Sequence, residues 1–215
     1  MDNSVGVTEV GTIEQGVKQA VENCLRVKAG ERAIIITDEE TIAIGSALKT
    51  AIEKITGPIQ LFVMEDFGEH PIDFPQAIED AIKVADVSIY AAQGAEGELQ
   101  TFRMQMLKAI DANSKLRHAH MIGITAQIMK DGMCSDYKEI HRISKLVYDK
   151  VRNASKIKVV TEKGNNFVAE FSPELKWIIS DGIIGPGHWK NLADGEVFTL
   201  PPQCQWQGHY RWVSW

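Results

Sequence analysis

The sequence has little that suits a membrane protein, a disulfide-stabilised protein or a nucleic-acid-binding protein. No apolar run approaches the roughly 20 residues needed to cross a membrane. The three cysteines, Cys24, Cys134 and Cys204, are odd in number and widely spaced, so we expect reduced thiols in a cytoplasmic protein. Acidic residues outnumber basic ones, 29 to 23, and no basic stripe stands out. We therefore expect no nucleic acid and no membrane among its partners.

Familiar catalytic and nucleotide-binding motifs are also missing. There is no P-loop, no Gly-x-Ser-x-Gly elbow and no His-Glu-x-x-His zinc helix. The glycines of Gly94–Gly97 follow an expected strand, but their spacing fits no dinucleotide fingerprint, and Gly182–Gly187 opens no helix. Residues 1–4 lack the positive start of a secretory leader, so none is expected.

What the sequence does contain is the pattern of a globular α/β protein. Its 215 residues are 44% hydrophobic and 24% charged, which suits one large domain or two small ones. In the first half, strand-like and helix-like segments alternate, which predicts right-handed crossovers and a mostly parallel sheet. The expected strands cover residues 33–37, 59–63, 86–91 and 117–122, and the expected helices begin near residues 13, 38, 74 and 98.

After about residue 125 this alternation changes. Asp136 and Glu139 form a capping box for a helix in which Ile140, Ile143, Val147 and Val151 are expected to face inward. Further short strands are expected at 156–161, 167–171, 177–180 and 196–200, the first two joined as a hairpin. We therefore predict an α/β domain with flanking helices over residues 1–125. A partial, strand-rich α+β domain over residues 126–215 is expected to follow, with an atypical tail from about residue 201.

Four polar or thiol side chains are candidates for chemistry on their position alone. Asp38 follows a buried strand, where ligands of open α/β sheets bind, but a helix N-cap accounts for it better. His118 and His120 are two residues apart and share one face of a strand, so a metal could use both. A satisfied pair, or an exposed strand end, is the favoured interpretation. Cys134 has no adjacent base in the sequence, which disfavours a thiol nucleophile.

Three stretches together resemble a known family. They are Val27–Asp38, His120–Tyr137 (in its segments 120–125 and 132–137) and Trp189–Thr199, of which the Asn-Leu-x-x-Gly-Glu-Val-Phe-Thr segment at 191–199 is the most specific. They look like the thermophilic metalloprotease family of aminopeptidases, which includes aminopeptidase T and leucyl aminopeptidases. The resemblance covers roughly residues 12 to 200. It implies an N-terminal α/β domain, a C-terminal domain holding a two-metal site, and a dimer.

The resemblance also implies a metal ligand and a reaction. Glu196, in Gly-Glu-Val-Phe, matches a carboxylate that bridges or ends a pair of divalent cations of the Zn, Co or Mg class. Two such cations activate a water molecule and polarise the carbonyl of a peptide substrate, so that its N-terminal residue is removed. No catalytic residue of this chain is identified by the resemblance.

The sequence departs from the family after this motif. No Asp or Glu follows Glu196, and His209 is the single histidine there. One carboxylate cannot hold two cations, because even one catalytic zinc usually takes three protein ligands. We therefore interpret the chain as a C-terminally truncated homologue and expect little turnover. Elements that pack against a missing domain would expose apolar surface, so we also expect a homodimer or self-association. A monodisperse monomer in light scattering would contradict that expectation.

The last fifteen residues differ in character from the rest. They hold three of the five tryptophans and show neither strand alternation nor a helical stripe. One interpretation is an aromatic tail that covers an exposed surface. Another is a frameshift, because codons from Gln203 onward, read one nucleotide later, can encode a turn followed by a strand. Sequencing the coding DNA beyond residue 200 decides between them.

Two other functions are kept open. One is a non-haem iron dioxygenase that opens a dihydroxypyridine-type ring, which needs a facial triad of histidines and a carboxylate. The other is an α/β module that binds a partner or a small molecule and catalyses nothing. Iron binding with ring cleavage would favour the first, and a stable fold without metal or turnover the second.

Overall fold

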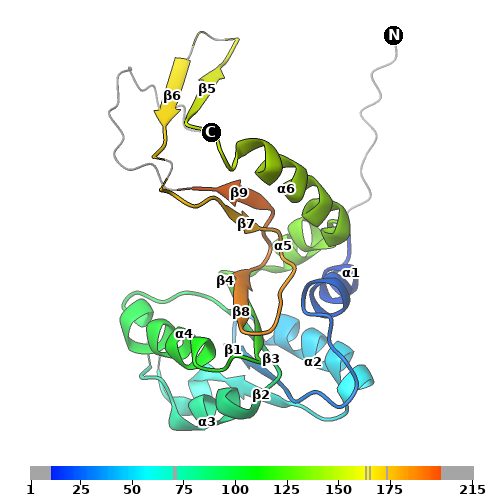
Figure 1. The fold of residues 1–215 in the computed structure, drawn as a ribbon. Helices are drawn as coiled ribbons and strands as arrows, with labels where there is room; N and C mark the ends of the chain where they lie inside the picture. The colour runs from blue at the N-terminus through cyan, green and yellow to red at the C-terminus, as the bar shows by residue number, and fades with distance from the viewer. Residues whose placement is uncertain (1–10, 70–71, 163, 165, 173, 200–215) are drawn as a thin grey trace.

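The structure is a computed structural model that describes residues 11–69, 72–162, 164, 166–172 and 174–199. It is a mixed α/β fold with one parallel sheet and two small antiparallel pairs (Figure 1). The atypical tail predicted from about residue 201 lies outside the described residues. Among the described helices, none has the length and apolar character to cross a membrane.

The main sheet is parallel throughout, as the alternating pattern predicts. Strands β1 and β3 are largely apolar, and β1, β3 and β4 are buried along almost their whole length, which suits a sheet covered on both faces. The strand order is β2-β1-β3-β4-β8. The strands are β1 (Ala33–Thr37), β2 (Gln60–Val63), β3 (Val87–Ala92), β4 (Arg117–Ile122) and β8 (His188–Asn191).

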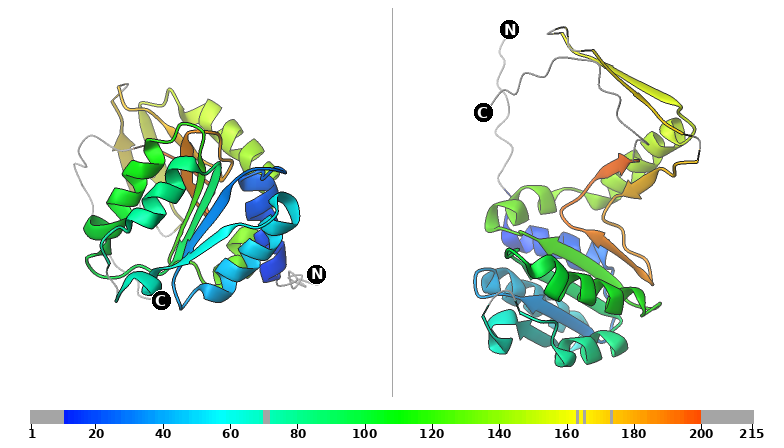
Figure 2. Two further views of the ribbon diagram at one scale, coloured as in Figure 1. Left: turned by 90° about the horizontal axis from the view of Figure 1, so that it is seen from below. Right: turned by 90° about the vertical axis from the view of Figure 1, so that its left-hand side faces the viewer.

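Helices cover both faces of this sheet (Figure 2). On one face, α1 (Ile13–Lys18), a π-helical turn (Gln19–Cys24) and α2 (Ile42–Thr56) pack on a core that includes Ile35 and Ile89. On the other face, α3 (Gln76–Val84) and α4 (Met104–Asp111), which a π-helical turn (Leu99–Arg103) precedes, enclose a second core that includes Ile36 and Tyr90. Alternate residues of each strand thus enter different cores.

Local sequence determines where several of these helices begin or end. The capping box predicted at Thr12 is present: its backbone amide donates to Gln15 Oε1 at 2.8 Å, and its hydroxyl accepts from the Gln15 amide at 3.2 Å. Gly57 ends α2 with a φ of 88°, which a residue with a Cβ adopts at a cost. Pro75 stands immediately before α3.

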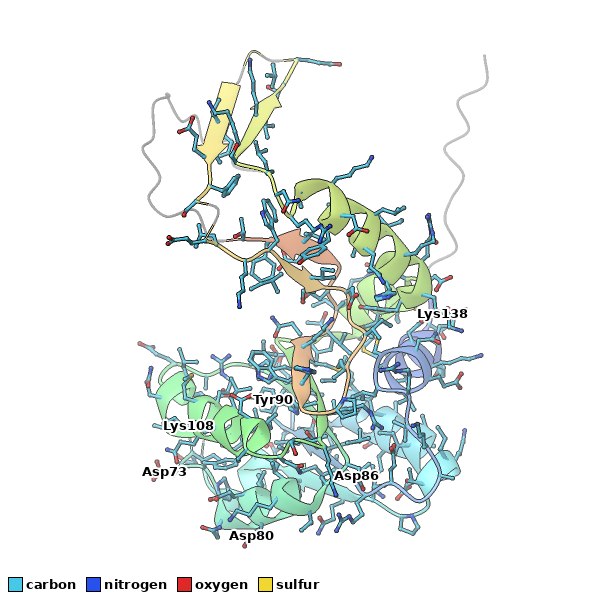
Figure 3. All side chains as sticks on the ribbon, viewed as in Figure 1. Asp73, Asp80, Asp86, Tyr90, Lys108 and Lys138 are labelled. Atoms are coloured by element: carbon cyan, nitrogen blue, oxygen red, sulfur yellow. The ribbon has the colours of Figure 1, made fainter. Side chains whose placement is uncertain are left out.

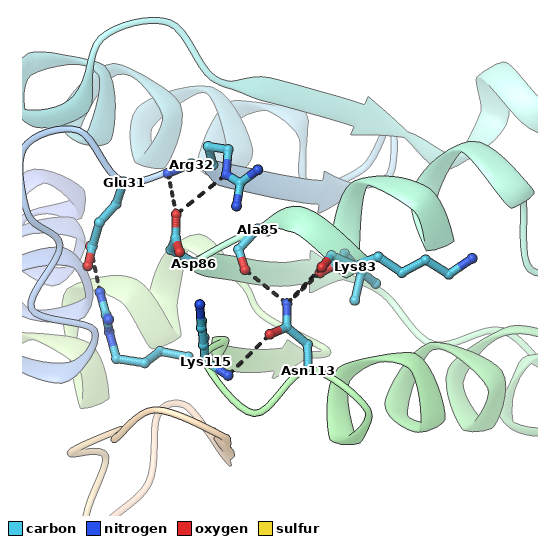
Figure 4. A network of polar contacts seen from close by, with 9 residues as sticks. Glu31, Arg32, Lys83, Ala85, Asp86, Asn113 and Lys115 are labelled. Carbon is cyan, nitrogen blue, oxygen red and sulfur yellow. Dashed lines mark hydrogen bonds and ion pairs between the residues drawn. The ribbon is translucent and has the colours of Figure 1, made fainter.

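The amino-terminal edge of the sheet is tied together by polar contacts (Figure 4). Asn113 Nδ2 donates to the carbonyls of Ile82 and Ala85 at 2.8 and 3.0 Å, which ties the turn after α4 to the end of α3. The Arg117 guanidinium meets Glu31 Oε2 at 2.6 Å. These contacts join segments that lie far apart in the sequence.

Beyond β4, the described residues form α5, a 3-10 turn, the longer helix α6 and five strands, one of which, β8, joins the main sheet. The Asp136 carboxylate caps α6 by accepting from the amides of Lys138 and Glu139. The predicted hairpin is present as β5 and β6, and β7 pairs with β9. The elements are α5 (Ala126–Lys130), a 3-10 turn (Gly132–Cys134), α6 (Tyr137–Val151), β5 (Lys156–Val160), β6 (Asn166–Glu170), β7 (Ile178–Ser180) and β9 (Glu196–Phe198); a further 3-10 turn (Met64–Phe67) follows β2.

The predicted inward face of α6 is wrong in part. Ile143 and Val147 are 47% and 41% exposed, whereas Tyr137 and Ser144 are buried and Ile140 packs against the first core. The helix has apolar residues on two sides, and the side that includes Tyr137 is the one that meets the core.

The sequence pattern does not predict strand β8. It belongs to the range 126–215, yet it pairs in parallel with β4 of the main sheet, His118 opposite Trp189. The later part of the chain therefore completes the edge of the first sheet, and the proposed boundary near residue 125 stays a prediction.

Candidate functional site

The carboxylate implied as a metal ligand lies at the surface. Glu196 begins β9 and is exposed, with Ser180 of β7 as its partner across the pair. Within the residues that the structure describes, no group of three or more His, Cys, Asp or Glu side chains is arranged to hold a metal ion. The role of Glu196 therefore stays a prediction.

The segment that leads into Glu196 is held by polar contacts. Asp194 accepts a hydrogen bond from the Ser180 hydroxyl through one oxygen and from the Gly195 amide through the other, at 2.8 Å. The Asp194 amide donates to the hydroxyl of the buried Tyr137 at 3.3 Å. The position of Glu196 is thus coupled to β7 and to the first turn of α6.

A buried carboxylate close by joins three elements. Asp181 follows β7, and its side chain is 3% exposed. Its Oδ2 accepts from His141 Nδ1 at 2.5 Å, and its Oδ1 accepts from Lys190 Nζ at 2.5 Å and from the Ile183 amide at 3.1 Å. Burial raises the pKa of Asp181, but the hydrogen bonds from Lys190 and His141 outweigh it and hold that pKa below its ordinary value.

This arrangement gives His141 a defined tautomer. Because the Asp181 carboxylate can only accept, the ring hydrogen on Nδ1 points at Asp181, and Nε2 is the ring nitrogen left for other partners. The His141 side chain is 42% exposed, and Nε2 makes no hydrogen bond with any described residue. Carboxylates that orient histidines in this way are common in proton transfer and in metal ligation.

No pattern in the sequence predicts this pair. His141 lies within a helical stripe and Asp181 precedes a glycine, 40 positions later. Neither residue belongs to a motif with a known spacing. The pairing depends on how α6 crosses β7, and α6 and β7 are in contact.

His118 and His120 do share one face of β4, as predicted, and both are buried. His118 Nδ1 is 2.7 Å from Ser88 Oγ, and its Nε2 is 3.4 Å from His120 Nδ1. Desolvation lowers the pKa of both rings, that of His120 to about 4. The two neutral imidazoles are hydrogen-bonded to each other and to Ser88. This arrangement agrees with the predicted pair of buried histidines whose hydrogen bonds are satisfied, and not with a metal site.

Aromatic contacts complete this cluster. The His120 ring stacks on Tyr90 with 5.0 Å between centroids, and Trp189 of β8 meets it edge-on at 5.9 Å. Tyr90, labelled in Figure 3, donates its hydroxyl hydrogen to the fully buried Glu98. Burial raises the pKa of Tyr90. Tyr90, Glu98, His118 and His120 are buried, and the hydrogen bonds among them and to Ser88 satisfy their polar atoms.

The interpretation of Asp38 as a helix cap is wrong. The N-cap of α2 is Thr41, and Asp38 is buried at the carboxyl end of β1. Its Oδ1 accepts from the Thr41 amide at 2.7 Å, and its Oδ2 accepts from the Gln93 amide, after β3, at 2.5 Å. Strands β1 and β3 flank the point where the strand order reverses, which is where such sheets usually bind ligands. Here a carboxylate of the chain itself fills that point.

The thiols show no catalytic arrangement. Cys134 Sγ lies 3.3 Å from the carbonyls of Thr12 and Met129, with no histidine among these contacts. Cys24 is buried, and desolvation raises the pKa of its thiol, which makes it unreactive. Cys204 lies outside the described residues.

One surface depression, of about 310 Å³, lies at the amino-terminal edge of the sheet. Arg32, Lys83, Asp86 and Asn113 are among the residues that line it (Figure 4). Ligands of open α/β sheets bind at the opposite, carboxyl edge. The depression therefore does not lie at the position where this fold class usually binds ligands.

Comparisons with known proteins support the fold. No protein-family model matches the chain, and no curated protein matches its sequence. Among solved structures, wild-type AmpT from Thermus thermophilus is similar, with a TM-score of 0.50 and 13% sequence identity over 88% of this chain. The chain spans 61% of the length of that structure. At this identity the likeness concerns the fold alone.

Proposed function

We propose that this chain is a distant relative of the metal-dependent aminopeptidases, which remove N-terminal residues from peptides. The observation that carries the proposal is the agreement in fold with AmpT over 88% of this chain. The segment 191–199, whose sequence resembles the family, supports it independently. We further propose that Glu196 supplies one carboxylate to a divalent cation of the Zn, Co or Mg class.

The described residues do not by themselves fit a two-metal centre. Glu196 is exposed, and the nearby Asp181 already accepts three hydrogen bonds. A catalytic zinc usually takes three protein ligands, and two cations need more. Donors beyond Glu196 must therefore come from outside the described residues. We expect the described part of the chain to supply a scaffold and one ligand.

Among the described residues, His141 has the geometry for proton transfer. Its Nδ1 hydrogen is held by Asp181, and its Nε2 is open to solvent. In a hydrolase an imidazole held in this way accepts a proton from an attacking water or returns one to a leaving amine. This proton transfer depends on His141 and Asp181 and not on the position of a metal ion.

The metal proposal is tested by locating a cation on the chain. Mn²⁺ titrated into ¹⁵N-labelled protein broadens the amide signals of residues close to the ion. We expect selective broadening at residues 196–198 and at Ser180, and its loss in Glu196→Gln. The control Glu40→Gln removes another exposed carboxylate, at the start of α2, and is expected to change nothing at β9. Equal broadening at β9 in Glu196→Gln would contradict the assignment.

An activity assay belongs beside this titration. Leucine p-nitroanilide with added Co²⁺ or Zn²⁺ is expected to show little turnover. Robust metal-dependent hydrolysis that survives Glu196→Gln would show that the ligands are other residues, such as His118, His120, His188 or those of a partner chain.

The non-enzymatic α/β module is the second candidate. It is favoured by the lack of any cluster of three metal-ligating side chains within the described residues. A stable fold with neither localised Mn²⁺ nor turnover would establish it. The ring-cleaving iron dioxygenase needs three ligands as well, and Fe²⁺-dependent ring opening would be required to favour it.

A further inference from the structure

The side chain of His141 combines a fixed ring with an accessible nitrogen. Its Nδ1 lies 2.5 Å from Asp181 Oδ2, and Asp181 Oδ1 accepts in turn from Lys190 Nζ at 2.5 Å. The Asp181 side chain is 3% exposed, so the carboxylate is out of water, whereas the His141 side chain is 42% exposed. Nε2 of His141 makes no hydrogen bond with any residue that the structure describes. The imidazole therefore offers an unused lone pair to a solute.

An imidazole that is held in this way can act as a nucleophile. Attack through Nε2 places positive charge on the ring, and the Asp181 carboxylate at Nδ1 stabilises that charge. The same carboxylate fixes the orientation of the ring before any reaction occurs. His188, which begins β8, is also exposed, but its ring has no carboxylate partner among the described residues. It therefore provides an internal comparison for the reactivity of His141.

Two lysines beside His141 determine which kind of electrophile approaches it. Lys138 and Lys145 lie three residues before and four residues after His141 on α6, which places all three on one side of the helix. Both lysines are exposed, and neither forms an ion pair with a described residue. An anion is therefore attracted to the open side of the imidazole. A phosphoryl group is an anion that a nitrogen nucleophile can attack, and lysine is a common partner of its oxygens.

The acidic side chains of α6 leave this positive charge in place. Glu139 is paired with Arg142 at 2.6 Å, so the two cancel each other. The Asp136 carboxylate caps the helix by accepting from two backbone amides. Asp149 lies two turns beyond His141, and its nearest cation is Arg152, at 3.9 Å. The surroundings of the open ring nitrogen are therefore cationic.

We propose that Nε2 of His141 accepts a phosphoryl group from a small acyl phosphate. The Nε2 lone pair forms the N–P bond as the P–O bond to the acyl group breaks, and the carboxylate product leaves with the bonding electrons. The ring becomes cationic, and its Nδ1 hydrogen stays in the hydrogen bond to Asp181. Lys138 and Lys145 offset the charge of the phosphoryl oxygens during the transfer. The reaction uses neither a metal nor a peptide, so it stands or falls separately from the proposed function.

Acetyl phosphate, added to the full chain in the presence of EDTA, tests the proposal. Mass spectrometry at neutral pH, where phosphorylated histidine survives, locates the phosphoryl groups residue by residue. We expect an acid-labile phosphoryl group on His141, added about tenfold faster than on His188 of the same molecule. His141→Gln is expected to remove it. Equal rates at the two histidines, or no phosphoryl group on His141, would overturn the proposal.

The two lysines are tested by removing their charge. Lys138→Gln with Lys145→Gln is expected to slow the phosphorylation of His141 by about fivefold, and added salt should slow the unchanged chain in the same direction. Lys54 on α2 and Lys108 on α4 are also exposed and form no ion pair with a described residue. Lys54→Gln with Lys108→Gln makes the same change in net charge and is expected to leave the rate unchanged. Equal slowing in the two double variants would overturn the proposed site.

Asp181 acts as a positioning residue in this reaction, and Asp181→Asn tests that role. The change keeps the size of the side chain and removes the charge that stabilises the cationic ring. We expect the rate at His141 to fall to about that at His188, with circular dichroism to check the fold. Loosened packing would expose His141 further and would not slow its reaction, so an undiminished rate would contradict the role of Asp181. The exposed lysine variants keep the site falsifiable if Asp181→Asn does not fold.

Discussion

Removing the buried carboxylate of Asp181 should destabilise the protein substantially. Asp181 accepts hydrogen bonds from His141 of α6, Lys190 of β8 and the Ile183 amide, so Asp181→Ala releases three donors at once. It also leaves the Lys190 ammonium, whose side chain is 22% exposed, without its carboxylate. The change removes the hydrogen bonds by which Asp181 connects α6 to the edge strand β8.

The expected loss is about 3 kcal/mol in the free energy of unfolding. Deleting one partner of a buried ion pair costs roughly 3–5 kcal/mol. The value lies at the lower end here because His141, at 42% exposure, can bond to water after the change. The deletion leaves the lysine charge behind, so replacing both partners by apolar residues should restore much of the stability. Asp181→Leu with Lys190→Met is therefore the informative double variant.

Urea denaturation, followed by circular dichroism, measures this loss. Asp181 has a pKa below its ordinary value of 3.8, so its contribution to stability is present above that value and is lost as the pH falls through the folded-state pKa. The difference between the unchanged chain and Asp181→Ala should thus be full at pH 7 and shrink below about pH 3.8. A loss under about 0.5 kcal/mol at pH 7, or a double variant less stable than Asp181→Ala, would refute the reasoning.

Two further predictions concern other parts of the molecule. His120 has its pKa lowered to about 4, so between about pH 6.5 and 4 the unfolded state binds a proton that the folded state does not, and this group alone should lower the free energy of unfolding by about 3 kcal/mol as the pH falls over that range. His120→Phe should therefore reduce the pH dependence measured by urea denaturation, with the contribution of His118 remaining, and an unchanged dependence would count against the assignment. Gly182 has a φ of 73°, and an added Cβ there would overlap the ring of Tyr137. Gly182→Ala should therefore cost about 3 kcal/mol in thermal unfolding, against about 1 kcal/mol for Gly30→Ala, where φ is 79° and the space is open; equal losses would show that the overlap is relieved.

Much of the fold could be predicted because local sequence and burial agree there. Strand β4 has the predicted bounds, Arg117–Ile122, and β1 is the buried run Ala33–Thr37. Such runs specify a strand covered on both faces before any tertiary contact is known. Capping residues such as Thr12 and Asp136 act within their own turn, so they too were recognised.

The predictions fail where contacts with a distant segment of the chain determine the local structure. Strand β8 reads His-Trp-Lys-Asn, which has one apolar residue and gains its strand conformation by pairing with β4. In α6 both stripes have helical spacing, and the spacing cannot tell which one meets the core. The position of Asp38 in the sequence favours a helix cap, whereas in the structure its carboxylate accepts from the amide of Gln93, 55 residues later.

The polar side chains of this protein fall into a buried, hydrogen-bonded group and a solvent-exposed group, and only the second is open to a substrate. At the carboxyl edge of the sheet, the usual ligand position of this fold, Asp38 is buried and accepts from the amides of Thr41 and Gln93, and the imidazoles of His118 and His120 are buried, neutral and already hydrogen-bonded. These polar groups stabilise the fold. By contrast, His141 and Glu196 are open to solvent, and both are anchored through β7, by Asp181 and by Ser180. Chemistry performed by this chain is therefore expected along α6, β7 and β9, of which β9 lies in the segment 191–199 that resembles a metallo-aminopeptidase.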